Sequence, residues 1–294
     1  MIYSGIVVLY NPDTENILGN IKTFYGQLDY LFLVDNSEKP NQSLISFCRK
    51  QKSECNIQYI FQNGNFGIAH ALNQGIKLAK QYNSDWLLTM DQDSLFQGDS
   101  FKEYINYIEG FEDKKSDVGL FTPYHKTKFD LVHKDVHFEY KEAVMTSGNF
   151  LKLSIVESVG VFREDYFIDN VDHEFCLRLR KNGYKIVQIN TVHLIHELGN
   201  ITPKNFFGQI VYPTNHNYIR RYYISRNRLR MVKDYIDFDK KYCFLELKAF
   251  IKETFFIILF ERNKISKLKS TLWGIWDFIF NNMGENKKFK ENRK

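Results

Sequence analysis

Cysteine is scarce in this chain, and long uncharged runs are absent from its apolar C-terminal part. The four cysteines show no CxxC spacing, which argues against a zinc site or a disulfide framework and favours a reducing compartment. The charge-free stretches near the C-terminus fall far below the roughly 20 residues that cross a bilayer. No basic segment precedes the first apolar run and no cleavage-like site follows it, so we interpret this run as a strand.

The overall composition is that of a globular protein, but the charge is unevenly distributed. Hydrophobic residues make up 44% and charged residues 26% of the 294 residues, which excludes a fully disordered chain. Residues 1–203 carry a net charge of −6, whereas residues 204–294 carry +11. This asymmetry predicts an acidic, metal-using catalytic part joined to a basic, aromatic part that meets an anionic partner.

Short apolar runs alternate with amphipathic stretches over the first 90 residues. This βαβαβαβ order predicts a mostly parallel sheet whose ligands bind beyond the carboxyl ends of its strands. The expected strands are 2–10, 30–34, 57–61 and 86–90, and the expected helices lie near 15–26, 42–52 and 67–82.

The pattern is less regular after residue 110 and becomes helical from about residue 215. We expect a strand at 118–122, a hairpin-like region at 125–143, a helix at 171–181 and a strand at 185–189. The predicted domains are a sheet-based domain over 1–212, with a division near residue 110, and a helical region over 213–294.

Polar residues follow each of the first four expected strands and are predicted to meet at one edge of the sheet. Asp91 and Asp93 come directly after the apolar LLTM run and can direct oxygens at one Mg²⁺ or Mn²⁺. A diphosphate would complete the coordination, and the cation would offset the charge that develops on a leaving nucleoside diphosphate. A solvated turn is the alternative interpretation of these two carboxylates.

Two further strand ends indicate a nucleotide site. Asp35 follows the LFLV run, where it is either a turn-forming residue or an acceptor for a base or ribose donor. The segment NGNFGIAHALNQG permits close backbone approach near a helix N-terminus. It lacks both the GxGxxG of a dinucleotide site and the GK[ST] of a P-loop, so both classes lose support.

Taken together, Tyr10-Asn11, VDNS, NGNFGIAHALNQG and LLTMDQDS resemble the family 2 glycosyltransferases, in particular bacterial rhamnosyltransferases. The resemblance covers roughly residues 2–230. It implies an α/β GT-A fold, a mostly parallel sheet flanked by helices with a C-terminal helical extension. It also implies a divalent cation and transfer of the sugar with inversion. The catalytic domain would then be 1–212, with nucleotide-sugar binding in 1–110 and acceptor binding and catalysis in 111–212. The DQDS form is similar to members that use dTDP-L-rhamnose, and a UDP-hexose or UDP-N-acetylhexosamine donor is the alternative.

The resemblance assigns roles by motif. It implies that Asp35 recognises the nucleotide base and that Asp93, with Asp91, binds the metal, which His196 also approaches. Ser147 and Gly148 are expected in the acceptor region. The remaining residues implied at the donor are Tyr10, Asn11, Asn65, Gly67 and, from the run YYISRNR, Arg226.

A second carboxylate cluster lies in FIDNVDHEF. Inversion by direct displacement requires a base that takes the proton of the acceptor hydroxyl. Family members usually carry Glu-Asp where this chain has Val171-Asp172, so the resemblance implies Asp172 as the base. Asp169 and Glu174, expected in the acceptor region, are alternatives for that role. All three acids also suit the N-terminal end of a helix, where they would favour the macrodipole.

The C-terminal helices combine aromatic residues with many lysines, and two interpretations stay open. They either attach the enzyme to the inner face of the bacterial cytoplasmic membrane, near a lipid-linked saccharide acceptor, or their apolar stripes form a homodimer interface or pack on the catalytic domain.

Three other function classes are disfavoured. A nucleotidyltransferase needs a Gly-rich, basic loop after the first strand, where this chain has YNPDTEN. A non-catalytic binding module has no use for the second acidic cluster. A nucleic-acid role lacks any reader motif.

Overall fold

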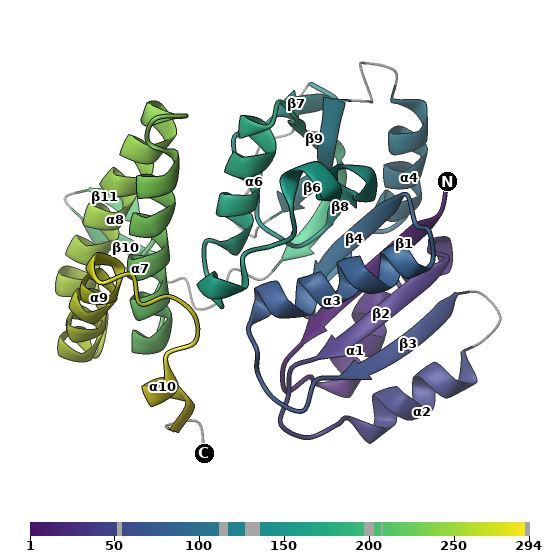
Figure 1. Ribbon diagram of the computed structural model, residues 1–294, viewed down its shortest axis with the longest axis horizontal. Coiled ribbons are helices and arrows are strands. Elements are labelled where there is room, and N and C mark those ends of the chain that lie inside the picture. Colours follow the sequence, from purple (N-terminus) through teal and green to yellow (C-terminus); the bar gives the residue numbers. More distant parts are fainter. Residues whose placement is uncertain (52–54, 112–116, 127–135, 197–202, 207, 292–294) are drawn as a thin grey trace. The chain divides into compact units, whose positions relative to one another are not determined.

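The chain forms two compact units, which are described separately. The computed structural model describes residues 1–51, 55–111, 117–126, 136–196, 203–206 and 208–291 (Figure 1). The first unit comprises Met1–Phe162 and Phe175–Glu197, and the second comprises Arg163–Glu174 and Leu198–Lys294. Residues 163–174 therefore group with the C-terminal helices, whereas the sequence prediction kept all residues up to 212 in one domain.

The first unit is built on one sheet with the strand order β3-β2-β1-β4-β8-β6-β9-β5, and β7 pairs with β9. Strands β3, β2, β1 and β4 are parallel, as the βαβαβαβ order predicted. The strands are β1 (Tyr3–Leu9), β2 (Tyr30–Asp35), β3 (Asn56–Phe61), β4 (Trp86–Asp91), β5 (Ser94–Phe96), β6 (Val118–Lys126), β7 (Phe138–Tyr140), β8 (Asn149–Lys152) and β9 (Lys185–His196).

Helices cover both faces of this sheet. Side chains from α1, α2 and α4 join one core cluster with alternate residues of the strands, such as Val7 and Leu88. Helix α3 crosses the opposite face (Figure 1), where Gly75 lies against Ile6. The helices that begin in this unit are α1 (Thr14–Ile21), α2 (Gln42–Lys50), α3 (Ile68–Gln81), α4 (Ser100–Gly110) and α5 (Val156–Val159), with short 3-10 turns at Tyr25–Gln27 and Leu153–Ile155.

Two elements differ in length from their sequence predictions. The first helix ends at Ile21, not near residue 26, because the chain turns there and buries Phe24 in the core. Strand β9 continues beyond residue 189 to His196, since it pairs in turn with β6, β7 and β5. Residues 127–135 of the expected 125–143 hairpin lie outside the described residues, which include β7 from this region.

Helix α6 (Val171–Lys181) matches its predicted bounds. Its first turn carries Asp172 and Glu174 and its last turn carries basic residues, so the charges at both ends favour the helix dipole. Gly183 follows in the left-handed region at φ 84°, the usual way for a helix to end.

The second unit is a group of helices with a short hairpin. Helix α9 packs closely on α7, since a Cβ on Gly274 would lie 2.4 Å from the Tyr222 carbonyl oxygen. Its elements are α7 (Tyr218–Tyr235), α8 (Lys240–Phe260), α9 (Lys264–Ile279), α10 (Lys287–Glu291), a 3-10 turn at Glu164–Tyr166, and the hairpin β10 (Lys204–Phe206) and β11 (Gln209–Val211).

Buried ion pairs join the three long helices of this unit. The Arg221 Nη1 atom lies 2.7 Å from Glu253 Oε2, and the Lys267 Nζ atom lies 2.7 Å from Glu261 Oε2. Arg221, Glu261 and Lys267 are all buried, so each charge depends on its partner. No helix among the described residues has the length and apolar content needed to cross a membrane.

Candidate active site

The parallel strands of the first unit bring the four predicted polar strand ends to one edge of the sheet. In the strand register, Leu9 pairs with Asp35 and Val8 pairs with Asp91, while Asp35 also pairs with Phe61. Four segments therefore emerge side by side at this edge: Tyr10-Asn11, Asp35, the 63–67 turn and the Asp91-Gln92-Asp93 turn.

Hydrogen bonds link these strand ends to one another. The Tyr10 amide donates to Gln92 Oε1 at 2.8 Å, and the Asn11 amide donates to Ser37 Oγ at 2.7 Å. The Asn36 Nδ2 group donates to the Gly67 carbonyl oxygen at 3.1 Å. Gln92 and Ser37 were not singled out from the sequence, although both stand inside motifs that were.

Asp35 lies at the base of this edge with no exposed surface. Its Oδ2 accepts from the Tyr59 hydroxyl at 2.5 Å, and its Oδ1 accepts from the Ser37 amide at 2.9 Å and from the Ser37 hydroxyl. Burial, followed by the bond to Asp35, raises the pKa of Tyr59, so Tyr59 stays a protonated donor. A carboxylate has about four acceptor positions, and these three bonds fill most of them on a fully buried group, so the expected contact of Asp35 with the nucleotide base stays a prediction.

The 63–67 turn leads into the N-terminus of α3. Asn65 Oδ1 accepts from the Gly67 amide at 3.0 Å, and Gly67 adopts φ 89°, a conformation that L side chains rarely take. Gly67 is buried and Asn65 half-buried. This turn brings backbone groups to the same edge as Asp35.

Asp91 is half-buried at the end of β4, and Asp93 is exposed two residues later. The Asp91 amide donates to Ser147 Oγ at 3.1 Å. Ser94 pairs with His196 across β5 and β9, so the backbone of His196 lies beside the residue that follows Asp93. The His196 side chain lies outside the described residues. Within the described part of the chain, no group of three or more His, Cys, Asp or Glu side chains gathers as a metal site.

The predicted acceptor residues Ser147 and Gly148 lie behind the Asp91 turn and are buried. His125 Nε2 lies 2.7 Å from the Ser147 carbonyl oxygen, and the Gly148 amide donates to the Thr89 carbonyl at 2.7 Å. This segment therefore supports β4 and Asp91. Its expected acceptor contact stays a prediction.

The second carboxylate cluster lies in the second unit, where the structure distinguishes its three members. Glu174 is 1% exposed, and its Oε1 accepts from the Tyr235 hydroxyl at 2.7 Å. Asp169 pairs with Arg220, and its side chain is 8% exposed. Asp172 is half-buried, and its Oδ1 accepts from the His173 amide at 2.9 Å. Burial raises the pKa of Asp169, against the opposing effect of Arg220.

The predicted donor-phosphate role of Arg226 requires correction. Arg226 is 1% exposed, and its guanidinium donates to the carbonyls of Gly284 at 2.7 Å and of Asn282, Asp165 and Tyr166 at 3.3 Å. A side chain enclosed in this way offers no surface to a phosphate. Arg226 instead has a structural role within its unit.

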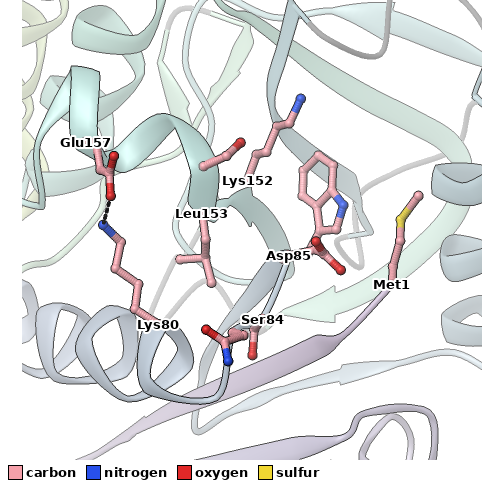
Figure 2. A pocket seen from close by; sticks show the side chains of 10 residues that line it. Met1, Lys80, Ser84, Asp85, Lys152, Leu153 and Glu157 are labelled. Atoms are coloured by element: carbon pink, nitrogen blue, oxygen red, sulfur yellow. Dashed lines mark ion pairs between the residues drawn. The ribbon is translucent and has the colours of Figure 1, made fainter.

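The first unit contains a cavity of about 710 Å³. Its lining includes Met1, Ser84 and Asp85 (Figure 2). Lys80 and Glu157, with 3.8 Å between Nζ and Oε1, form an ion pair at its wall. Trp86 and Asp85, which also line it, stand at the start of β4, so the cavity opens at the amino ends of the strands. It is therefore separate from the candidate site.

Comparisons with known proteins agree with the motifs. Residues 4–171 match the family model described as Glycosyl transferase family 2. The chain is 26% identical over 291 residues to a dTDP-rhamnosyl transferase, RfbF, of Shigella flexneri, and the alignment covers 94% of both chains.

Solved structures show the same fold at low sequence identity. S. aureus TarS 1-349 in complex with UDP-GlcNAc has a TM-score of 0.61 at 14% identity, over 95% of this chain and 81% of that one. GalNAc-T7 with UDP, GalNAc and Mn²⁺ has a TM-score of 0.61 at 12% identity, over 83% of this chain and 50% of that one. This chain thus spans about half the length of GalNAc-T7.

The sheet order, the flanking helices and these likenesses identify a GT-A type fold with a C-terminal helical region. The family model covers more than half of the chain, and the bacterial relative covers nearly all of it. The chain is therefore a glycosyltransferase, and it belongs to glycosyl transferase family 2.

Proposed function

We propose that this enzyme transfers L-rhamnose from dTDP-L-rhamnose to a saccharide acceptor, with inversion at the anomeric carbon. The observation that carries the donor class is the hydrogen-bonded edge where Asp35, the 63–67 turn and Asp91 meet. The choice of dTDP-rhamnose rests on RfbF, which aligns over 94% of the chain at 26% identity. A UDP-hexose or UDP-N-acetylhexosamine donor is the alternative, since TarS is known with UDP-GlcNAc.

Asp172 is the proposed base. It takes the proton of the acceptor hydroxyl while that oxygen forms a bond to the anomeric carbon. The bond from this carbon to the β-phosphate oxygen breaks, and its electron pair leaves with dTDP. The engagement of Glu174 by Tyr235 and of Asp169 by Arg220 supports Asp172 over these two alternatives.

The carboxylates after β4 fit a divalent cation of the Mg²⁺ or Mn²⁺ type. Asp91 and Asp93 offer hard oxygen donors two residues apart in one turn, at the edge where the diphosphate is expected. The cation, when bound, would neutralise charge on the leaving diphosphate. The GalNAc-T7 structure, which contains Mn²⁺, supports this proposal, and the sequence also implies His196 near the metal.

Thermal stability with dTDP, UDP, GDP and CMP, each with and without Mn²⁺, tests the donor. A ligand that binds the folded state at 100 times its Kd adds about 2.7 kcal/mol of stability. We expect dTDP with Mn²⁺ to raise the melting temperature most. A larger rise with UDP would keep the enzyme class and overturn the rhamnose donor, and no response to any nucleotide would overturn the donor site.

The acceptor is proposed to be a lipid-linked saccharide at an anionic membrane surface on which α8 and α9 dock. The exposed charged residues of both helices are all lysine: Lys240, Lys241, Lys248, Lys252, Lys264 and Lys269. The acidic residues of α8 and α9 have partners within the unit. Glu246 pairs with Arg228 and Glu253 pairs with Arg221, while Asp277 is buried and accepts from the Tyr222 hydroxyl.

Large apolar side chains share these exposed faces. Each lysine near an anionic leaflet contributes on the order of 1 kcal/mol, and the apolar groups enter the headgroup boundary. On α8 the exposed apolar residues are Phe244, Leu245, Ile251, Phe255, Ile258 and Leu259. On α9 they are Ile265, Leu272, Trp276 and Ile279.

Flotation with vesicles of neutral lipid, with or without anionic phospholipid, tests this surface. We expect the full chain to float only with anionic vesicles. The double variant that combines Phe255→Glu with Trp276→Glu should no longer float. Val161→Glu, at an exposed apolar residue of the first unit, is the matched control. The membrane proposal would be overturned if the wild-type chain did not float with anionic vesicles. If that chain also formed a dimer in analytical sedimentation and the double variant were a monomer, the surface would bind a second copy of the chain instead.

A further inference from the structure

The segment that leads to Asp172 has an unusual backbone. Phe167 adopts φ 65° and ψ −64°, and the Ile168 amide donates to the Tyr166 carbonyl oxygen at 2.8 Å. These features define a γ-turn of the rare, strained hand. Asp169 at φ 64° and Asn170 at φ 59° continue in the left-handed region. Three of the four residues from Phe167 to Asn170 therefore have positive φ, and non-glycine residues keep such angles only where the surroundings enforce them.

Asn227 of α7 holds this turn through its side-chain amide. Its Nδ2 group lies 2.9 Å from the Tyr166 carbonyl oxygen, 2.8 Å from that of Ile168 and 3.0 Å from that of Asp169. Asn227 has no exposed surface, so no water competes for these bonds. One amide therefore fixes three carbonyls of the strained turn.

Arg226 completes the clamp from the neighbouring position. Its Nη2 donates to the carbonyls of Asp165 and Tyr166, and its Nε donates to Asn227 Oδ1 at 3.0 Å. This last bond orients the amide, because it requires the Asn227 oxygen to face Arg226 and the nitrogen to face the turn. The two residues thus act as one unit.

Other side chains of α7 anchor the same segment at points around the turn. The Phe167 ring stacks on Tyr223 with 5.2 Å between ring centroids. Arg220 pairs with Asp169, and the Tyr235 hydroxyl donates to Glu174. Asp172 lies within this anchored stretch.

We infer that Asn227, oriented by Arg226, is a positioning residue that sets the place of the Asp172 carboxylate by enforcing the 166–170 turn. This inference rests on the proposed role of Asp172 as the base. Without the amide, the turn is free to relax toward ordinary backbone angles, and the first turn of α6 would move with it. A displacement of about 1 Å at a reacting group can cost on the order of 100-fold in rate.

Asn227→Asp is the sharpest test, because it keeps the size of the side chain and an oxygen for Arg226 Nε. It replaces the donor to three carbonyls with an acceptor that repels them. The assay is release of dTDP from dTDP-L-rhamnose with water as the acceptor, alongside the Kd of dTDP with Mn²⁺. We expect kcat to fall on the order of 100-fold while the dTDP Kd stays within about twofold.

Asn217→Ala is the matched control. Asn217 caps α7 through the Arg220 amide at 2.9 Å but does not contact the turn. It should weaken the helix and leave kcat near the wild-type value. If Asn227→Asp kept its kcat, or lost kcat only together with dTDP affinity, the positioning role would be overturned.

A second pair of variants covers the case in which Asn227→Asp does not fold. Asn170→Gly and Asn170→Ala both remove the side-chain amide, but glycine accepts φ 59° and alanine resists it. Asn170→Ala should lose clearly more kcat than Asn170→Gly, and equal losses would contradict control by the turn. Asp172→Asn separates the two proposals. A normal kcat in Asp172→Asn would overturn the role of Asp172 as the base. A reduced kcat in Asp172→Asn with a normal kcat in Asn227→Asp would overturn only the positioning role of Asn227.

Discussion

Gly274→Ala should destabilise the second unit by forcing α9 away from α7. A Cβ at this position would lie 2.4 Å from the Tyr222 carbonyl oxygen, 3.0 Å from Ser225 Cβ and 3.2 Å from the Arg226 amide nitrogen. The closest atom belongs to the backbone of a helix, so it cannot swing aside as a flexible side chain would. The two helices must separate to admit a methyl group.

The expected magnitude is the difference between two opposing effects. Overpacking a tight contact costs about 1–3 kcal/mol, and a backbone obstacle places this case at the upper end. Alanine in a helix gains about 1 kcal/mol over glycine. The net loss is about 2 kcal/mol, which corresponds to a fall in Tm of about 4–8 °C at the usual 2–4 °C per kcal/mol for proteins of this size.

Gly19→Ala is the matched control, because an added Cβ there meets no atom within 4 Å. It sits inside α1, where the same substitution brings only the helical gain, so its Tm should rise by about 2–4 °C. Differential scanning calorimetry of both variants measures the contrast. A rise in Tm for Gly274→Ala equal to that of Gly19→Ala would refute the close crossing of α7 and α9.

Three further predictions concern the metal, acid stability and the thiols. Asp93→Ala should weaken Mn²⁺-dependent dTDP binding at least tenfold, about 1.4 kcal/mol, by calorimetric titration, while the exposed acid Asp99→Ala should not. Burial and the nearby Arg220 and Arg221 lower the pKa of His216 to about 3. His216 therefore stays neutral in the folded chain while the unfolded chain gains a proton below about pH 6.5, so stability should fall as pH drops from 6.5. The loss should reach at most about 2 kcal/mol at pH 5, less where solvent screens the group, and His216→Gln should flatten this acid limb in urea titrations. Burial raises the pKa of Cys48 to about 11 and of Cys55 to about 12, so a thiol reagent at pH 7 should modify neither until urea unfolds the chain.

Much of the donor edge was predictable because its information is local in the sequence. An apolar run followed by a polar turn is visible without any distant contact, and the βαβ order places such turns on one edge of a parallel sheet. Asp35 and Asp91 end β2 and β4, as the pattern predicted. The end of α6 at Lys181 also followed from the Asn182-Gly183 pair that comes directly after it.

The contacts among these residues were not predictable. The sequence offers no sign that Gln92 would bond to the Tyr10 backbone or that Ser147 would support Asp91, since each pair is more than 50 residues apart. Arg226 was expected at donor phosphates from the resemblance of the run YYISRNR to the family, and arginine suits phosphates, but its neighbours enclose it. Residue type gives a chemical capacity, whereas burial decides whether that capacity reaches a ligand.

The sequence by itself determined the order of the first four strands and the three helices between them, and the positions of the acidic motifs, because periodicity, caps and turns depend on neighbouring residues. Tertiary structure alone decided the partners of the second carboxylate cluster. Arg220 pairs with Asp169 and the Tyr235 hydroxyl donates to Glu174, although these partners stand 51 and 61 residues later in the chain. Partners so far apart along the chain meet only when packing buries them together, and no local pattern records that packing.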